Sequence, residues 1–104
     1  IKAGVNFREF AEKSWKLPDN CYDNHYPCII HGVGLCDEWP LVAYPNRDFS
    51  NADYSANFEE NMTICVESYV GEVGGKEGIK LEDQFVVTKD GLKQLSSFPY
   101  EIDI

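Results

Sequence analysis

The chain has 104 residues and is 43% hydrophobic, which suits one small domain or part of a larger one. Its 18 acidic and nine basic residues give a formal net charge of −9, which argues against a nucleic-acid partner because phosphate binding needs a basic face. No apolar run approaches the roughly 20 residues of a membrane helix. We therefore expect a soluble, cytoplasmic protein whose four cysteines are reduced thiols.

The first predicted element is a helix that begins after Asn6 and ends at Leu17-Pro18. The Asn6 side chain can cap it, and Glu9 three residues later can complete a capping box. One face carries Phe7, Phe10, Ala11 and Ser14, so we expect the helix to pack against a sheet.

Three apolar segments further along the chain are predicted strands. Residues 28–31 form a short one that leads into the glycines of His31-Gly-Val-Gly34. Residues 62–70 and 79–88 are richer in β-branched and aromatic residues and are the strongest predicted strands. The glycine-rich segment 71–78 should join these two as a hairpin, whereas residues 43–60 are expected to be a loop.

One imidazole and two carboxylates in these strands are candidate metal ligands. His31 lies at a strand end flanked by glycine, where a metal can approach it. Glu67 and Glu82 each lie in an apolar strand, where an ionised carboxylate is costly unless it is paired. If the strands pair antiparallel, both carboxylates can face one cleft, where a cation offsets their repulsion. The alternatives are a core histidine and two carboxylates that face solvent.

These motifs resemble, over residues 20 to 100, the C-terminal half of the pita-bread metalloenzymes. That family includes methionine and Xaa-Pro aminopeptidases, prolidase, creatinase and a dimethylsulfoniopropionate lyase. The resemblance implies an α/β (α+β) fold with a curved antiparallel sheet backed by helices. It also implies that His31, Glu67 and Glu82 bind a divalent metal, with two ions per site, iron favoured, and manganese, cobalt or zinc as alternatives. The family's other two ligands are earlier aspartates, so residues 1–104 are expected to be an incomplete, C-terminal portion of the catalytic domain.

The segment after His31 departs from the peptidases of this family. They carry a second histidine that donates a hydrogen bond to the substrate carbonyl, whereas here the stretch is shorter and Asp37 lies in its place. An ionised aspartate cannot donate a hydrogen bond and would repel an oxyanion, but it can accept a proton. Together with the run from Val66 to Gly75, this segment is most similar to the dimethylsulfoniopropionate lyase branch.

That branch implies a metal-dependent lyase that forms acrylate and dimethylsulfide, with Asp37 as general base and Glu38 as the fallback. The alternative for Asp37 is a loop residue that caps a turn. Tyr26 and Trp39 are expected to bind the sulfonium through cation–π attraction, with hydrophobic packing as the alternative. Lys80 stands where the family usually has an arginine. The other functions left open are an Xaa-Pro metallopeptidase, like aminopeptidase P or prolidase, and a non-catalytic binding protein. A small-molecule substrate and a homodimer are the expected partners.

Overall fold

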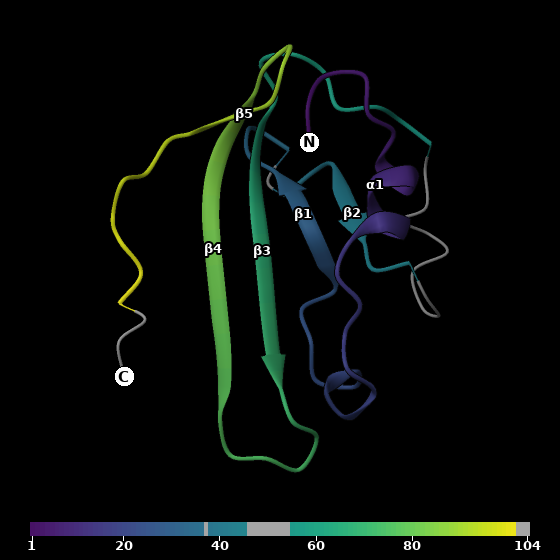
Figure 1. Cartoon of the computed structure of the whole chain (residues 1–104), viewed down its shortest axis with the longest axis vertical. Coiled ribbons are helices and arrows are strands. Elements are labelled where there is room, and N and C mark those ends of the chain that lie inside the picture. The colour runs from purple at the N-terminus through teal and green to yellow at the C-terminus, as the bar shows by residue number, and fades with distance from the viewer. Residues whose placement is uncertain (37, 46–54, 102–104) are drawn as a thin grey trace.

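The computed structural model describes residues 1–36, 38–45 and 55–101. Its centre is a five-stranded antiparallel sheet with the strand order β2-β1-β3-β4-β5 (Figure 1). The strands are β1 (Cys28–Gly32), β2 (Leu41–Ala43), β3 (Thr63–Gly71), β4 (Gly78–Val87) and β5 (Leu92–Gln94). The long β3–β4 hairpin dominates the sheet, as predicted from its β-branched and aromatic residues.

The three predicted strands are confirmed to within one residue at each end, and the segment 71–78 does join β3 to β4. The short edge strands β2 and β5 were not predicted. β5 pairs only with Phe85, Val86 and Val87, so no described strand pairs with the outer edge of residues 78–83.

Helix α1 (Phe7–Lys13) begins where the sequence predicts but ends four residues earlier. The Asn6 side chain accepts hydrogen bonds from the backbone N–H groups of Arg8 and Glu9, as expected for an N-cap. Ser14 has an extended backbone and its hydroxyl donates to the Ala11 carbonyl, which ends the helix. No helix of the described residues is long and apolar enough to cross a membrane.

The hydrophobic core lies between α1 and one face of the sheet. The rings of Phe7 and Phe58 meet edge to face, with their centroids 4.6 Å apart. The remaining buried core residues are Ala11, Ile30, Val42, Ile64 and Val87. Among the described residues α1 is the only α-helix, followed by the 3-10 turn η1 (Asp19–Cys21), so a sheet backed by several helices is not shown.

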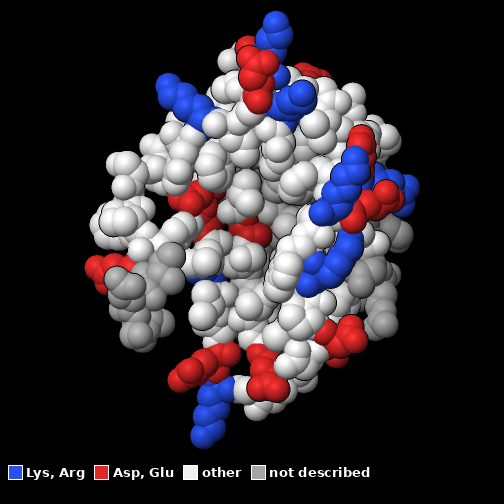
Figure 2. All heavy atoms as spheres, viewed as in Figure 1, with Lys and Arg blue, Asp and Glu red and all other residues white. Residues whose placement is uncertain are grey.

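Charged side chains are distributed in a way that agrees with the absence of a basic cluster in the sequence. On the face shown in Figure 2, basic side chains lie beside acidic ones around the rim, and no continuous basic patch forms among the described residues. On helix α1, for example, Lys13 pairs with Glu9 and Arg8 with Glu12.

Candidate metal centre

The register of the three central strands brings the predicted ligands side by side. His31 of β1 is paired with Cys65 of β3, and Glu67 of β3 is paired with Glu82 of β4. Opposed residues of an antiparallel pair share a face, as do alternate residues of one strand. All four side chains therefore project from the face opposite the core residue Ile64.

The polar atoms of the three predicted ligands converge. His31 Nε2 lies 3.1 Å from Oε2 of Glu67 and 3.4 Å from Oε1 of Glu82. The exposed fraction of the side chain is 9% for His31, 1% for Glu67 and 35% for Glu82. The cluster thus has a buried floor formed by His31 and Glu67 and one more accessible carboxylate, that of Glu82.

The orientation of the His31 ring suits metal binding. Its Nδ1 lies 2.9 Å from the Gly32 carbonyl oxygen, which can only accept, so Nδ1 donates this hydrogen bond. Nε2 then faces the two carboxylates. A backbone acceptor on one ring nitrogen, with the other nitrogen directed at the site, is typical of metal-binding histidines.

The negative charge of the buried Glu67 carboxylate is only partly compensated by neighbouring groups. Both of its oxygens are buried, and neither accepts a well-formed hydrogen bond from the described residues. The Lys80 ammonium lies 2.5 Å from Oε1 of Glu67 and 3.3 Å from Oε2 of Glu82. Each carboxylate thus turns one oxygen towards His31 and the other towards Lys80. One imidazole and two carboxylates fit a hard or borderline divalent cation, so these residues suit the metal that the resemblance implies.

Hydrogen bonds and charges also fix the protonation of Glu82. Burial raises the pKa of this carboxyl, but hydrogen bonds from Cys65 and Lys80 and the nearby charges outweigh it, so the pKa lies below its usual value. The carboxylate is consequently held in the ionised form that a metal needs.

Cys65 is a member of the cluster that the sequence analysis did not count. Its Sγ, a ring nitrogen of His31 and a carboxylate oxygen of Glu82 all lie within 4.8 Å of one another. The thiol is free, as predicted, and it is buried; burial together with its hydrogen bond to Glu82 raises its pKa. The available signal was strand alternation, because Cys65 precedes Glu67 by two residues.

Tyr26 connects the cluster to the loop after β1. Its hydroxyl donates to the carboxylate of Glu38, at 3.1 Å and 2.9 Å from the two oxygens, and this bond is the main reason that its pKa is raised to about 12. Its ring carries the Lys80 ammonium 5.1 Å from the centroid. The ring therefore lies under a cation beside the candidate ligands, and its binding of a sulfonium stays a prediction.

The remaining predicted site residues lie in the loop after β1. Asp37, the predicted base, lies outside the described residues. Trp39, which was predicted to bind the sulfonium, is 50% exposed. A Cβ added to Gly32 would lie 2.1 Å from the Trp39 carbonyl oxygen, so glycine is needed for the close approach of this loop to β1.

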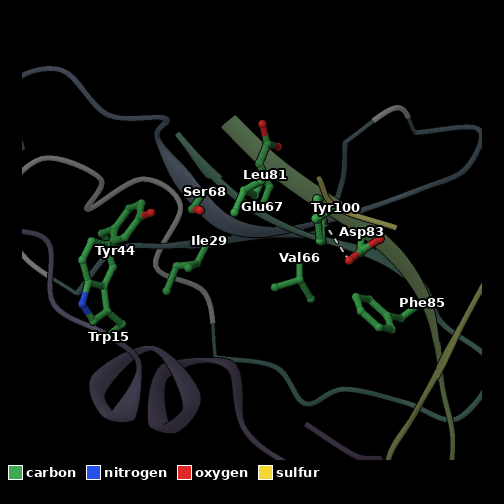
Figure 3. A pocket seen from close by; sticks show the side chains of 10 residues that line it. All are labelled: Trp15, Ile29, Tyr44, Val66, Glu67, Ser68, Leu81, Asp83, Phe85 and Tyr100. Atoms are coloured by element: carbon green, nitrogen blue, oxygen red, sulfur yellow. Dashed lines mark hydrogen bonds between the residues drawn. The ribbon is translucent and has the colours of Figure 1, made fainter. Parts of the chain in front are cut away.

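A hollow on the core side of the sheet is distinct from this cluster (Figure 3). Apolar side chains such as Val66, Leu81 and Phe85 line it, and Trp15 lies at its far end. At its other end the Tyr100 hydroxyl donates to Asp83 at 2.8 Å. Of the four cluster residues only Glu67 borders the hollow, so the candidate chemistry lies on the other face.

Comparisons with known proteins agree with this geometry. The family model for metallopeptidase family M24 matches residues 1–89. Two proteins named dimethylsulfoniopropionate lyase DddP, from Roseovarius nubinhibens and Roseobacter denitrificans, are 46% and 44% identical to this chain over 101 residues. Each alignment covers 97% of this chain and 22% of the relative. A Xaa-Pro dipeptidase of Pyrococcus horikoshii is 32% identical over 84 residues, which are 78% of this chain and 20% of that protein. The chain thus spans about a fifth of the length of these relatives.

Proposed function

Because this chain belongs to metallopeptidase family M24, whose members are metal-dependent, we propose that it forms part of a lyase that cleaves dimethylsulfoniopropionate to acrylate and dimethylsulfide. The observation that carries this choice is the identity of 44–46% to two proteins named as such lyases, over 97% of the chain. The Xaa-Pro dipeptidase is less similar, at 32% over 78% of the chain. The missing second histidine supports the same choice.

The proposal concerns a longer protein, in which residues 1–104 are the C-terminal portion of the catalytic domain. His31, Glu67 and Glu82 would hold the metal there, together with ligands from elsewhere in that protein. When bound, the metal supplies positive charge that stabilises the negative charge developing on the substrate carboxylate.

We propose two metal ions per site, with iron favoured. The two facing carboxylates support the number, because each presents one oxygen to His31 and the other to the Lys80 ammonium. Two separate cation positions therefore lie along this pair of carboxylates. The mixed nitrogen and oxygen donors suit iron, and also manganese, cobalt or zinc.

In the proposed reaction Asp37 accepts the proton from the carbon next to the substrate carboxylate. The electron pair left on that carbon forms the double bond of acrylate as the carbon–sulfur bond breaks, and dimethylsulfide leaves with the sulfur electron pair. Tyr26 would hold the sulfonium against its ring, where Lys80 now lies. Glu38, the alternative base, is held by the Tyr26 hydroxyl close to the same place.

The activity of the complete, metal-loaded protein tests this proposal. Dimethylsulfide release from dimethylsulfoniopropionate, measured by gas chromatography, is the expected result, with Xaa-Pro dipeptides left intact. Cleavage of the dipeptides without dimethylsulfide release would instead establish the peptidase. Metal binding without either reaction would favour a binding protein. The 104-residue chain by itself, given the same metals, should do neither reaction, because part of the ligand set is supplied from outside it.

For the complete protein we also propose a cytoplasmic location and a homodimer. The four cysteines of the described residues are free thiols, which suits a reducing compartment. The homodimer rests on the family resemblance alone, and light scattering coupled to gel filtration would test it.

A further inference from the structure

Cys65 on the middle strand β3 brings a sulfur atom to the candidate metal centre. Cys65 is paired directly with His31 on one side and with Gln84 on the other. Glu82 lies on the same face of the sheet, two residues before Gln84. Cys65 therefore occupies the middle strand of the cluster rather than its margin.

The distances allow one ion to contact sulfur, nitrogen and oxygen together. The Cys65 Sγ, a ring nitrogen of His31 and a carboxylate oxygen of Glu82 lie within 4.8 Å of one another. Bonds to zinc are about 2.3 Å for sulfur and about 2.0–2.2 Å for nitrogen and oxygen, so donors of one tetrahedral ion lie somewhat closer than this. Binding one ion would therefore draw these three donor atoms closer together.

Independent support for a cation here comes from Glu67, which is not in that triplet. Its side chain is 1% exposed, and both oxygens lack a well-formed hydrogen bond from the described residues. Oε2 of Glu67 points at Nε2 of His31, 3.1 Å away. Lys80 pairs with Oε1 of this buried carboxylate, so a metal ion beside Oε2 would supply positive charge to its second oxygen.

We propose that Cys65 binds the metal through its sulfur, as a ligand additional to His31, Glu67 and Glu82. On binding, the S–H bond breaks, a sulfur–metal bond forms, and the proton leaves to solvent. The Gln84 amide, whose Nε2 lies 3.8 Å from Sγ, donates a weak hydrogen bond to the sulfur. The inference rests on the proposed metal centre but not on the substrate.

A sulfur ligand has a consequence for which ions the site retains. Thiolate favours softer or borderline ions, so iron, cobalt and zinc gain relative to manganese and magnesium. A site made only of imidazole and carboxylates favours these ions less strongly. Cys65 would therefore act as a residue that determines metal specificity.

Cobalt spectroscopy of the complete protein tests the proposal. The metal-free protein is titrated with Co²⁺ in the absence of oxygen, and its visible ligand-field bands report whether the site is filled. We expect a sulfur-to-cobalt charge-transfer band in the near ultraviolet for the parent and its loss in Cys65→Ser. The matched control is Cys28→Ser, which changes a buried cysteine of β1 outside the triplet and should keep the band.

Two results would overturn the inference, and they differ from failure of the proposed metal centre. Ligand-field bands without the charge-transfer band in the parent, or a charge-transfer band that persists in Cys65→Ser, would remove Cys65 from the ligand set. Absence of the ligand-field bands in the parent would reject the metal centre itself. X-ray absorption of the zinc-loaded Cys28→Ser protein gives a check that does not depend on the folding of Cys65→Ser. It should show a zinc–sulfur distance of about 2.3 Å, and a shell of nitrogen and oxygen alone would contradict the proposal.

Discussion

The ammonium of Lys80 lies 2.5 Å from Oε1 of Glu67, so a half-exposed cation reaches one of the most buried carboxylates of the chain. The other oxygen of Glu67 faces His31. Lys80 thus compensates one side of the carboxylate and leaves the other side for a second positive charge. Lys80 also lies near Oε2 of Glu82. We therefore expect Lys80 to compete with a metal ion for the position between Oε1 of Glu67 and Oε2 of Glu82.

Replacing Lys80 by Met should therefore separate stability from metal affinity. Without metal, Lys80→Met should lower the free energy of unfolding by about 1–3 kcal/mol, because a buried carboxylate loses its partner. The same variant should bind metal more tightly, because the competing charge is gone. Urea denaturation and calorimetric metal titration measure the two effects. Lys93→Met, at an exposed position on β5, is the control and should change neither. Equal metal affinity in Lys80→Met and the parent would show that the lysine does not compete.

Glu67→Gln tests the buried ligand directly. The amide keeps the shape of the side chain but not its charge, so metal content after dialysis should fall while the far-ultraviolet circular dichroism stays unchanged. His31→Ala should lose the metal as well. Glu77→Gln removes an exposed carboxylate from the β3–β4 loop and should retain the metal of the parent. Full metal content in Glu67→Gln would exclude this residue as a ligand.

Asp37→Asn separates the base from the metal ligands. If Asp37 accepts the proton, dimethylsulfide release by the complete protein should fall by about 10²–10⁴-fold, the usual contribution of a general base. Metal content should match that of the parent, because Asp37 is not proposed as a ligand. Unchanged release would transfer the role to Glu38, whose carboxylate is held by Tyr26.

The ring of Tyr26 and its hydroxyl can be tested separately. Tyr26→Phe keeps the face that now carries Lys80 but loses the hydrogen bond to Glu38. If the ring binds the sulfonium, KM for the substrate should stay close to that of the parent in Tyr26→Phe and rise in Tyr26→Ala. Because the pKa of Tyr26 is raised to about 12, ionisation of its hydroxyl should not contribute to the pH profile near neutrality. An equal rise of KM in both variants would assign binding to the hydroxyl.

The contact between Tyr100 and Asp83 should depend on pH. Hydrogen bonds from Tyr100 and Ser96 lower the pKa of Asp83 below its ordinary value of 3.8. The contact is therefore complete above that value and is lost as the pH falls through the lowered pKa. The NMR signals of the Tyr100 ring should shift in that acidic range. Asp83→Asn should abolish the acid-dependent shift, and a persistent shift would mean that another group controls the contact.

The parts of the fold that follow from local sequence were predictable. β3 and β4 were placed to within one residue because their β-branched and aromatic residues favour strands over a long stretch. β2 and β5 have three residues each and owe their extended form to the neighbours with which they pair, which a sequence pattern does not show. The helix was predicted too long because Ser14 turns its hydroxyl back onto the chain.

For the candidate site, strand alternation was enough to place Glu67 opposite Glu82. The same alternation places Cys65 on that face, but this residue was considered only as one of four reduced thiols. The hydrogen bond from Tyr26 to Glu38 joins residues twelve positions apart through the folding of the loop, and no local pattern indicates it.

The unpaired outer edge of residues 78–83 has a further consequence, for the behaviour of the chain in solution. No described strand covers this edge, so it can pair with an edge of another molecule, beside the exposed side chains of Ile79 and Leu81. The same edge also carries charged residues, because the sequence here is Ile79-Lys80-Leu81-Glu82-Asp83. Charged side chains on an edge strand oppose such association. The charged residues of the candidate metal site would thereby also limit self-association. Screening their charges with salt, or protonating the carboxylates at low pH, should therefore promote aggregation of the chain.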